Sequence, residues 1–169
     1  MAARREAGFT YFTVLFLVTV MGLAAAAAGT MWHTVRQREK ERELLALGGE
    51  FRAAIARYVR ATPSGKPQYP RRLDDLVRDP RVPGVARHIR RIYQDPMTGR
   101  PDWGVVPAPD GGIMGVHSLS EGQPLKRAGF RVADARFEGA EKYADWQFVY
   151  RDRFIGGPAA PRDARRPGS

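Results

Sequence analysis

The stretch that decides the fold runs from Phe9 to Trp32 and reads FTYFTVLFLVTVMGLAAAAAGTMW. It contains no Asp, Glu, Lys or Arg, and its apolar run is interrupted only by threonines and two glycines. About 20 apolar residues in a helix are enough to cross the hydrocarbon core of a bilayer. A helix is required there because lipid offers no hydrogen-bond partners to an open backbone. The stretch therefore predicts a transmembrane helix over residues 9–32.

A short polar segment, residues 1–8, precedes this run and carries Arg4 and Arg5. A secretory signal is the alternative because the alanines at 24–28 imitate a cleavage region, but the apolar core of such a signal spans only about 7–15 residues. Trp32 is well placed as an anchor at the membrane interface. By charge alone the reverse orientation is favoured, since the span is followed by Arg36, Arg38, Lys40 and Arg42.

The tripeptide Gly8-Phe9-Thr10 stands between the basic leader and the uncharged span. In this setting it resembles the prepilin-type processing site shared by type IV pilins and by the pseudopilins of type II secretion systems. The resemblance implies that a prepilin peptidase cuts after Gly8 and methylates the amine of Phe9. Because that peptidase acts on the cytoplasmic side, the resemblance implies a single-pass protein of the inner (cytoplasmic) membrane with its head in the periplasm or exterior.

The chain departs from the family pattern at Thr13, the fifth mature position, where pilins and pseudopilins have a glutamate. In the family that carboxylate pairs with the N-terminal amine of a neighbouring subunit. A threonine cannot supply the charge, so the chain resembles the major pseudopilin without its usual glutamate. The departure favours a tip, accessory or divergent subunit over an ordinary fibre subunit.

The helix is expected to continue over residues 33–61, because no proline occurs from Phe9 until Pro63. Spacings of three and four place one apolar stripe on this amphipathic segment, formed by Leu44, Leu47, Phe51, Ile55 and Tyr58. The other face is expected to carry Glu39, Glu43, Glu50, Arg52 and Arg57. Gly48 and Gly49 form a soft point at which the helix can bend or melt.

Residues 62–154 are expected to form a periplasmic head. The helix-breaking residues at 62–65 are expected to end the long helix, and residues 69–77 predict a short helical turn. One face of a second short helix is predicted from the spacing of Val85, Ile89 and Ile92. These segments resemble pseudopilins as well, in which a Tyr-Pro and spaced leucines lead into an Asp-Pro loop, here residues 95–99.

The rest of the head predicts β structure. Residues 103–106 and 113–117 flank a turn-rich connection that is typical of a hairpin, and residues 146–150 predict a third strand with alternating aromatics. The fold class is therefore α+β: a long helix packed on a small antiparallel sheet, an arrangement in which both elements bury an apolar face. By resemblance, this fold is pilin-like. Residues 155–169, rich in Gly, Pro, Ala and Arg, predict a disordered tail.

The net charge of +10, from 28 Lys and Arg against 18 Asp and Glu, favours anionic partners. The best candidate for such a surface is the group Arg87, Arg90 and Arg91. Three interpretations stay open for it. It forms a solvated face, it contacts anionic lipid or an acidic patch of the next subunit, or it holds nucleic acid through phosphates.

No catalytic residue, cofactor or metal site is predicted. The chain has no Cys, which excludes disulfide scaffolds, thiol nucleophiles and Cys-based zinc sites, and its three histidines lie too far apart for a helical zinc pair. His117 and Ser118 are strand neighbours that point to opposite faces, which disfavours a triad with Asp102. The loop at 118–126 takes the place where many major pseudopilins bind calcium, but Glu121 is its only carboxylate.

The sequence thus predicts an assembly protein and not an enzyme: a pilin-like structural subunit of a type II secretion pseudopilus or related filament. By resemblance, its partners are other pilin or pseudopilin subunits, prepilin peptidase, the inner-membrane assembly platform and membrane lipid. Two alternatives stay open. One is a DNA-uptake pilin that binds nucleic acid through its basic surface, and the other is a single-pass membrane-anchored periplasmic domain.

Overall fold

The computed structural model describes the backbone of residues 6–62 and 67–151, and their side chains except those at 6–10 and 24–31. The predicted tail, residues 155–169, and the first five residues of the predicted leader lie outside these ranges. The chain divides into two compact units, Met1–Lys40 and Glu41–Ser169. Its helices and strands are α1 (Glu6–Arg60), α2 (Asp74–Val77), β1 (Gly104–Pro107), β2 (Ile113–His117), the 3-10 helices η1 (Val132–Phe137) and η2 (Tyr143–Asp145), and β3 (Phe148–Val149).

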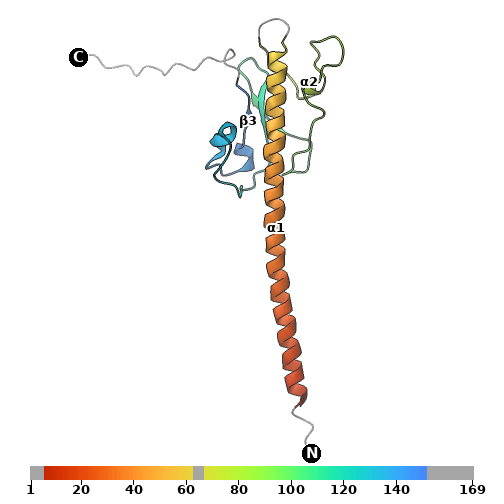
Figure 1. Cartoon of the computed structure of the whole chain (residues 1–169), viewed down its shortest axis with the longest axis vertical. Helices are drawn as coiled ribbons and strands as arrows, with labels where there is room; N and C mark the ends of the chain where they lie inside the picture. The colour runs from red at the N-terminus through yellow and green to blue at the C-terminus, as the bar shows by residue number, and fades with distance from the viewer. Residues whose placement is uncertain (1–5, 63–66, 152–169) are drawn as a thin grey trace, which may run out of the picture. The chain divides into compact units, whose positions relative to one another are not determined.

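In the second unit, α1 runs beside the sheet and buries one face against it (Figure 1). The predicted stripe is confirmed: Leu44, Phe51 and Ile55 have no exposed surface, Tyr58 is buried and Leu47 is half-buried. Each fully buried apolar side chain of this size contributes roughly 1.5–3 kcal/mol. The α+β class is thus correct, and the second half of α1 is held to the head mainly by apolar packing.

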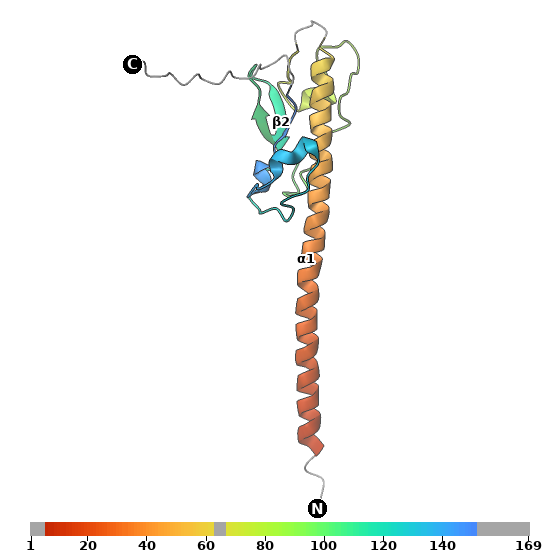
Figure 2. The same cartoon turned by 60° about the vertical axis from the view of Figure 1, so that its left-hand side comes forward.

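The sheet is antiparallel, with the strands in the order β1-β2-β3 (Figure 2). The hairpin of β1 and β2 confirms the two strands predicted around residues 103–117. Asp110 fixes its turn, because one carboxylate oxygen accepts the N–H of Gly112 and the other accepts the N–H of Tyr69. The hairpin is thereby tied to the segment that leads into α2, the predicted short helical turn.

The third strand is shorter than the predicted 146–150. Only Phe148 and Val149 form β3, opposite Val116 and Gly115 of β2. Trp146 is instead the C-terminal cap of η2, since its N–H donates to the carbonyl of Tyr143 at 3.1 Å. Trp146 and Phe148 are fully buried, so the aromatic alternation did locate the core.

The predicted short helix over Val85, Ile89 and Ile92 is wrong, because the chain forms bends there. Its backbone donors are used by other elements: the N–H groups of His88 and Ile89 both donate to the carbonyl of Leu76 in α2. Ile89 is buried while Val85 is exposed, so the apolar spacing does not mark one continuous face. Docking on α2 replaced local helix formation.

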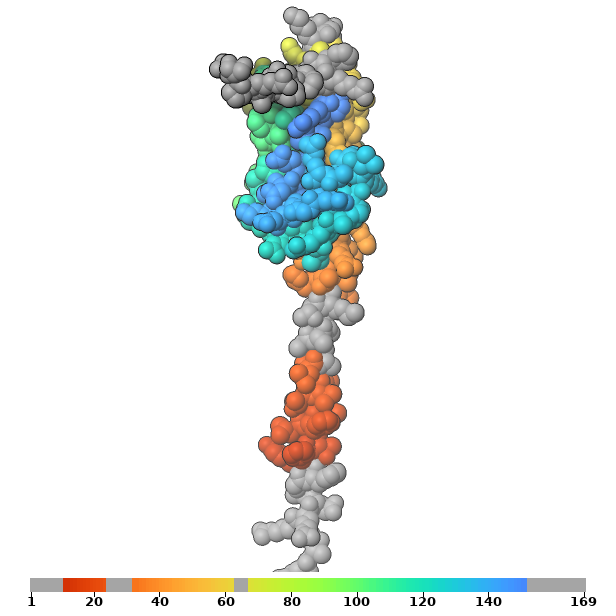
Figure 3. All heavy atoms as spheres, turned by 90° about the vertical axis from the view of Figure 1, so that its left-hand side faces the viewer, coloured from red at the N-terminus to blue at the C-terminus, as the bar shows by residue number. Residues whose placement is uncertain are grey.

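Four of the five charged residues expected on the outer face of α1 are exposed, but the prediction for Arg52 is wrong, and α1 stays helical at the predicted soft point. The helix continues through Gly48, whose missing side chain makes room for the ring of Phe148. Arg52 was expected on the charged outer face, but it is mostly buried in an ion pair with Asp134 of η1. Figure 3 shows the segment from about residue 120 to 150, in cyan and blue, covering this face of the head. That segment brings Asp134 to the helix, which the sequence of α1 alone does not reveal.

Candidate functional site

The predicted processing residues lie at the start of α1, which begins at Glu6. The side chains of Gly8, Phe9 and Thr10 fall outside the described residues, so cleavage and methylation there stay predictions. Thr13, at the position of the family's glutamate, is exposed on α1.

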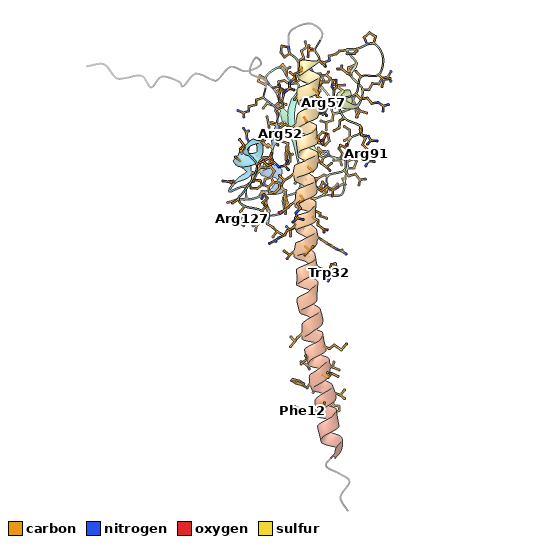
Figure 4. All side chains as sticks on the ribbon, in the orientation of Figure 1. Phe12, Trp32, Arg52, Arg57, Arg91 and Arg127 are labelled. Atoms are coloured by element: carbon orange, nitrogen blue, oxygen red, sulfur yellow. The ribbon has the colours of Figure 1, made fainter. Side chains whose placement is uncertain are left out.

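The first half of α1 has an apolar surface that is exposed at the residues whose side chains are described. Every residue from Tyr11 to Leu23 is exposed, and Tyr11, Phe12 and Met21 each show 72% of their surface. Figure 4 labels Phe12 and Trp32 on this half of α1, and Trp32 is 67% exposed. The hydroxyl of Thr19 donates to the carbonyl of Leu15 at 2.8 Å, so this polar group is satisfied within the helix.

Among residues whose side chains are described, no helical stretch meets the length and apolarity needed to cross a membrane. Residues 9–10 and 24–31 of the predicted span 9–32 lie outside that set.

A buried ionic network holds the chain after α2 against the end of α1. The carboxylate of Asp79 accepts hydrogen bonds from Arg81 Nε at 2.9 Å, from Arg81 Nη2 at 2.7 Å and from His88 Nε2 at 3.0 Å. Arg81 also donates to the carbonyl of Tyr58 and to the hydroxyl of Thr62, both at 2.8 Å. Arginine near a helix C-terminus is favourable because the last carbonyls carry partial negative charge. The network therefore closes the C-terminal end of α1.

The same network fixes the charge state of Asp79. The side-chain hydrogen bonds from Arg81 hold the pKa of the Asp79 carboxyl far below its ordinary value, and the bond from His88 acts in the same direction. The Arg81 guanidinium lies over the ring of Tyr58, 3.5 Å from its centroid. Burial raises the pKa of the Tyr58 phenol. These groups are structural, since each is engaged inside the head.

A basic groove lies beside this network, between α1 and the segment that follows α2. It has a volume of about 680 Å³ and is lined by Glu50 and Arg57 of α1 and by Arg87, His88, Ile89, Arg90, Arg91 and Tyr93. Arg57 joins the two walls, because its Nη2 and Nε donate to the carbonyl of His88 at 2.6 and 3.2 Å. Arg57 and Arg91 are labelled in Figure 4. We call this feature the arginine groove.

The arginine groove brings together the three residues that the sequence singled out, Arg87, Arg90 and Arg91. Sequence reasoning missed Arg57 as a fourth member. It did place Glu50 and Arg57 on one face of the helix, and they lie two turns apart with their side chains 4.0 Å from each other. Which loop would pack on that face could not be found from helical periodicity, because the contact spans 31 residues of sequence.

Sequence reasoning also missed a buried carboxylate on α1. Glu41 Oε1 accepts the N–H groups of Leu125 and Lys126, at 2.5 and 3.3 Å, and the hydroxyl of Tyr143 at 2.9 Å. This single side chain anchors the end of the 118–126 loop to the helix. Within the described part of the chain, no three His, Asp or Glu side chains gather as metal ligands do.

The loop at 95–99 is organised around Asp95, which is fully buried. Its carboxylate accepts the N–H of Met97 at 2.9 Å, the hydroxyl of Thr98 at 3.1 Å and the hydroxyl of Ser118 at 2.7 Å. Ser118 is therefore bonded to Asp95, and the His117 ring contacts the carbonyl of Ser118 instead of its hydroxyl. Asp95 fastens this loop to the end of β2.

Comparison with models of protein families, with curated proteins and with solved structures gives no match to this chain.

Proposed function

We propose that the chain is a pilin-like structural subunit of a type II secretion pseudopilus or a related filament, held in the inner membrane by its N-terminal helix. The observation that carries this proposal is the uncovered apolar surface from Tyr11 to Leu23. A protein in water rarely exposes a contiguous apolar patch of more than a few hundred Å². Such a surface requires lipid or the helices of other subunits around it.

The mechanism of this protein is polymerisation. Helices of neighbouring subunits pack side by side through their apolar halves, and each head is carried on the amphipathic half of its own α1. The head supports this role because the apolar side chains that are buried, among those described, belong to residues 44–148 and form its core without the first half of α1. The hydrogen bond from the Thr19 hydroxyl to the carbonyl of Leu15 supports this role too, since a hydroxyl that is bonded within its own helix needs no partner from lipid.

The sequence supports a processed N-terminus. Gly8 before Phe9 and Thr10, between a basic leader and an uncharged stretch, is the arrangement that prepilin peptidase recognises in the family that the chain resembles. Thr13 leaves a subunit without the carboxylate that pairs with a neighbour's amine. We therefore propose a tip or accessory position, where fewer neighbours require that ion pair.

The test is the chemistry of the mature N-terminus. In cells that contain prepilin peptidase, mass spectrometry of the wild-type chain should find a methylated Phe9 as the first residue. Gly8→Ala should retain Met1, because the peptidase site must admit a residue without a side chain. The matched control is Ala7→Gly, which leaves Gly8 in place and should be processed normally.

Two outcomes would contradict the proposal. Normal processing of Gly8→Ala would show that residues 8–10 are not a prepilin-type processing site. A wild-type N-terminus after the alanines at 24–28 would instead indicate a secreted domain that has lost the apolar helix.

A further inference from the structure

The arginine groove carries positive charge that the head itself does not neutralise. Arg87, Arg90 and Arg91 are exposed, and within the described ranges none of the three pairs with a carboxylate or donates a hydrogen bond. Arg91 lies over the ring of Tyr93, with its guanidinium carbon 5.6 Å from the ring centroid. Glu50 is the one carboxylate among the groove's described lining residues, and its side chain is 4.0 Å from Arg57.

The nearby carboxylates are engaged elsewhere. Residues 71–91 contain seven arginines and three aspartates. Asp79 is buried with Arg81 and His88, and Asp75 accepts the backbone N–H groups of Arg71 and Arg72 at 2.9 Å. Asp74 pairs with Arg72 at 3.2 Å. Of the arginines of this segment, Arg87, Arg90 and Arg91 therefore face solvent at the groove with these carboxylates engaged elsewhere.

The groove is also built on an anchored backbone. The carbonyl of His88 accepts two hydrogen bonds from Arg57, the N–H groups of His88 and Ile89 donate to Leu76, and the side chain of Ile89 is buried. The arginines that flank these residues are thus displayed from fixed positions. Less conformational entropy is lost on binding when the binding groups are held in place beforehand.

We infer that the arginine groove binds the phosphate backbone of nucleic acid without reading its bases. Guanidinium groups match phosphate oxygens in geometry and charge, and three exposed arginines within five residues suit a ligand with dense linear charge. A sequence pI near 10.6 with three exposed arginines lining one groove matches the electrostatic pattern of such binders.

Base recognition is disfavoured by the aromatic residue of the groove. Tyr93 is half-buried, its ring packs edge-on against Phe51 at 6.2 Å, and Arg91 lies over it. It offers no free platform on which successive bases could stack. Binding should therefore depend strongly on salt and little on sequence.

A membrane surface is the less favoured source of phosphate. Among the described lining residues, Ile89 is buried and Tyr93 is half-buried, so the groove presents no exposed apolar side chain that could enter the acyl region of a bilayer. The inference goes beyond filament assembly and does not depend on it.

The experiment measures binding of a fluorescent oligonucleotide to the full-length chain in an uncharged detergent, over a series of salt concentrations. The test variant carries Arg87→Gln, Arg90→Gln and Arg91→Gln. The control variant also loses three exposed arginines, by Arg127→Gln, Arg131→Gln and Arg136→Gln. In Figure 4, Arg127 lies on the other side of α1 from Arg91. Both variants should unfold at the wild-type temperature, because none of the six side chains is buried.

We expect the test variant to bind at least tenfold more weakly and to lose about three units of the slope of log K against log salt, about one for each phosphate contact. The control variant should bind within about threefold of wild type, with no change of slope. Oligonucleotides of unrelated sequence should bind equally well.

Three results would overturn the inference. Equally weakened oligonucleotide binding in both variants would show that binding depends only on the net charge of the chain. Competition by polyglutamate as strong as that by unlabelled oligonucleotide would indicate an acidic protein partner. Arginine-dependent binding to vesicles of anionic lipid, without oligonucleotide binding, would assign the groove to a membrane.

Discussion

The two halves of α1 differ in where their apolar side chains go. From Tyr11 to Leu23 they are all exposed, whereas Leu44, Phe51 and Ile55 are completely buried against the chain's own sheet. The second half is amphipathic and finds its partner within the head. The first half is apolar all round, and a helix of that kind is stable only inside a protein core or a membrane. In the proposed function, the head stabilises the second half of α1, and lipid or other subunits cover the first half.

The largest expected effect comes from placing charge in the first half. Leu17→Asp with Met21→Asp should remove the chain from the membrane fraction, because each carboxylate at the centre of a spanning helix costs about 2.5–3.5 kcal/mol. Membrane fractionation measures the loss, and the head should keep its unfolding midpoint. The control is Val85→Asp, which places charge on an apolar side chain exposed in the head and should stay in the membrane. Full retention of the double variant would show that the first half is not held by lipid.

A second prediction concerns the ionic network at the end of the second half. Asp79→Asn should destabilise the head by about 3 kcal/mol at neutral pH, because it breaks a buried pair and leaves Arg81 without its counter-charge. Urea unfolding followed by the fluorescence of buried Trp103 and Trp146 measures the change. The control is Asp74→Asn, an exposed pair with Arg72 that should cost at most about 1 kcal/mol.

The lowered pKa of Asp79 also predicts that the stability lost in Asp79→Asn depends on pH. Because the folded pKa of Asp79 lies below its unfolded value of about 3.9, the network contributes fully above that value and loses its contribution as the pH falls through the folded pKa. The stability difference between wild type and Asp79→Asn should therefore be constant near neutral pH and shrink below about pH 4. A difference that stays the same in acid would show that the carboxylate charge of Asp79 is not what stabilises the network.

Local patterns predicted most of the elements of the head. The stripe from Leu44 to Tyr58, the hairpin and the aromatic core around Trp146 follow from side-chain periodicity, which depends only on neighbouring residues. The predicted helix at Val85–Ile92 failed because its backbone donors bond to α2, a contact that periodicity does not encode. The place of Arg52 was wrong for a related reason, since Asp134 is 82 residues away in sequence.

The sequence predicted which arginines belong to the candidate site, but it did not predict that they line a groove. Charge counting found Arg87, Arg90 and Arg91, but the groove exists because the carbonyl of His88 meets Arg57 across the chain. The network of Asp79 and the anchor of Glu41 were missed, because a charged residue is usually exposed and only tertiary structure shows which one is buried.

The smallest expected effect separates two adjacent glycines in the second half of α1. In a helix interior, alanine is favoured over glycine by about 0.5–1 kcal/mol. At Gly49 nothing lies within 4 Å of an added side chain, so Gly49→Ala should stabilise the head by about that amount.

At Gly48 an added methyl group would overlap the buried ring of Phe148. Overpacking of this kind costs about 1–3 kcal/mol, which exceeds the gain in helix propensity, so Gly48→Ala should destabilise the head by roughly 1–2 kcal/mol. Urea unfolding of the two variants should give shifts of opposite sign. Equal stabilisation by both would mean that Phe148 does not pack against this turn of α1. The second half of α1 would then lack one of the closest contacts that bury it in the head, and it would differ less from the exposed first half.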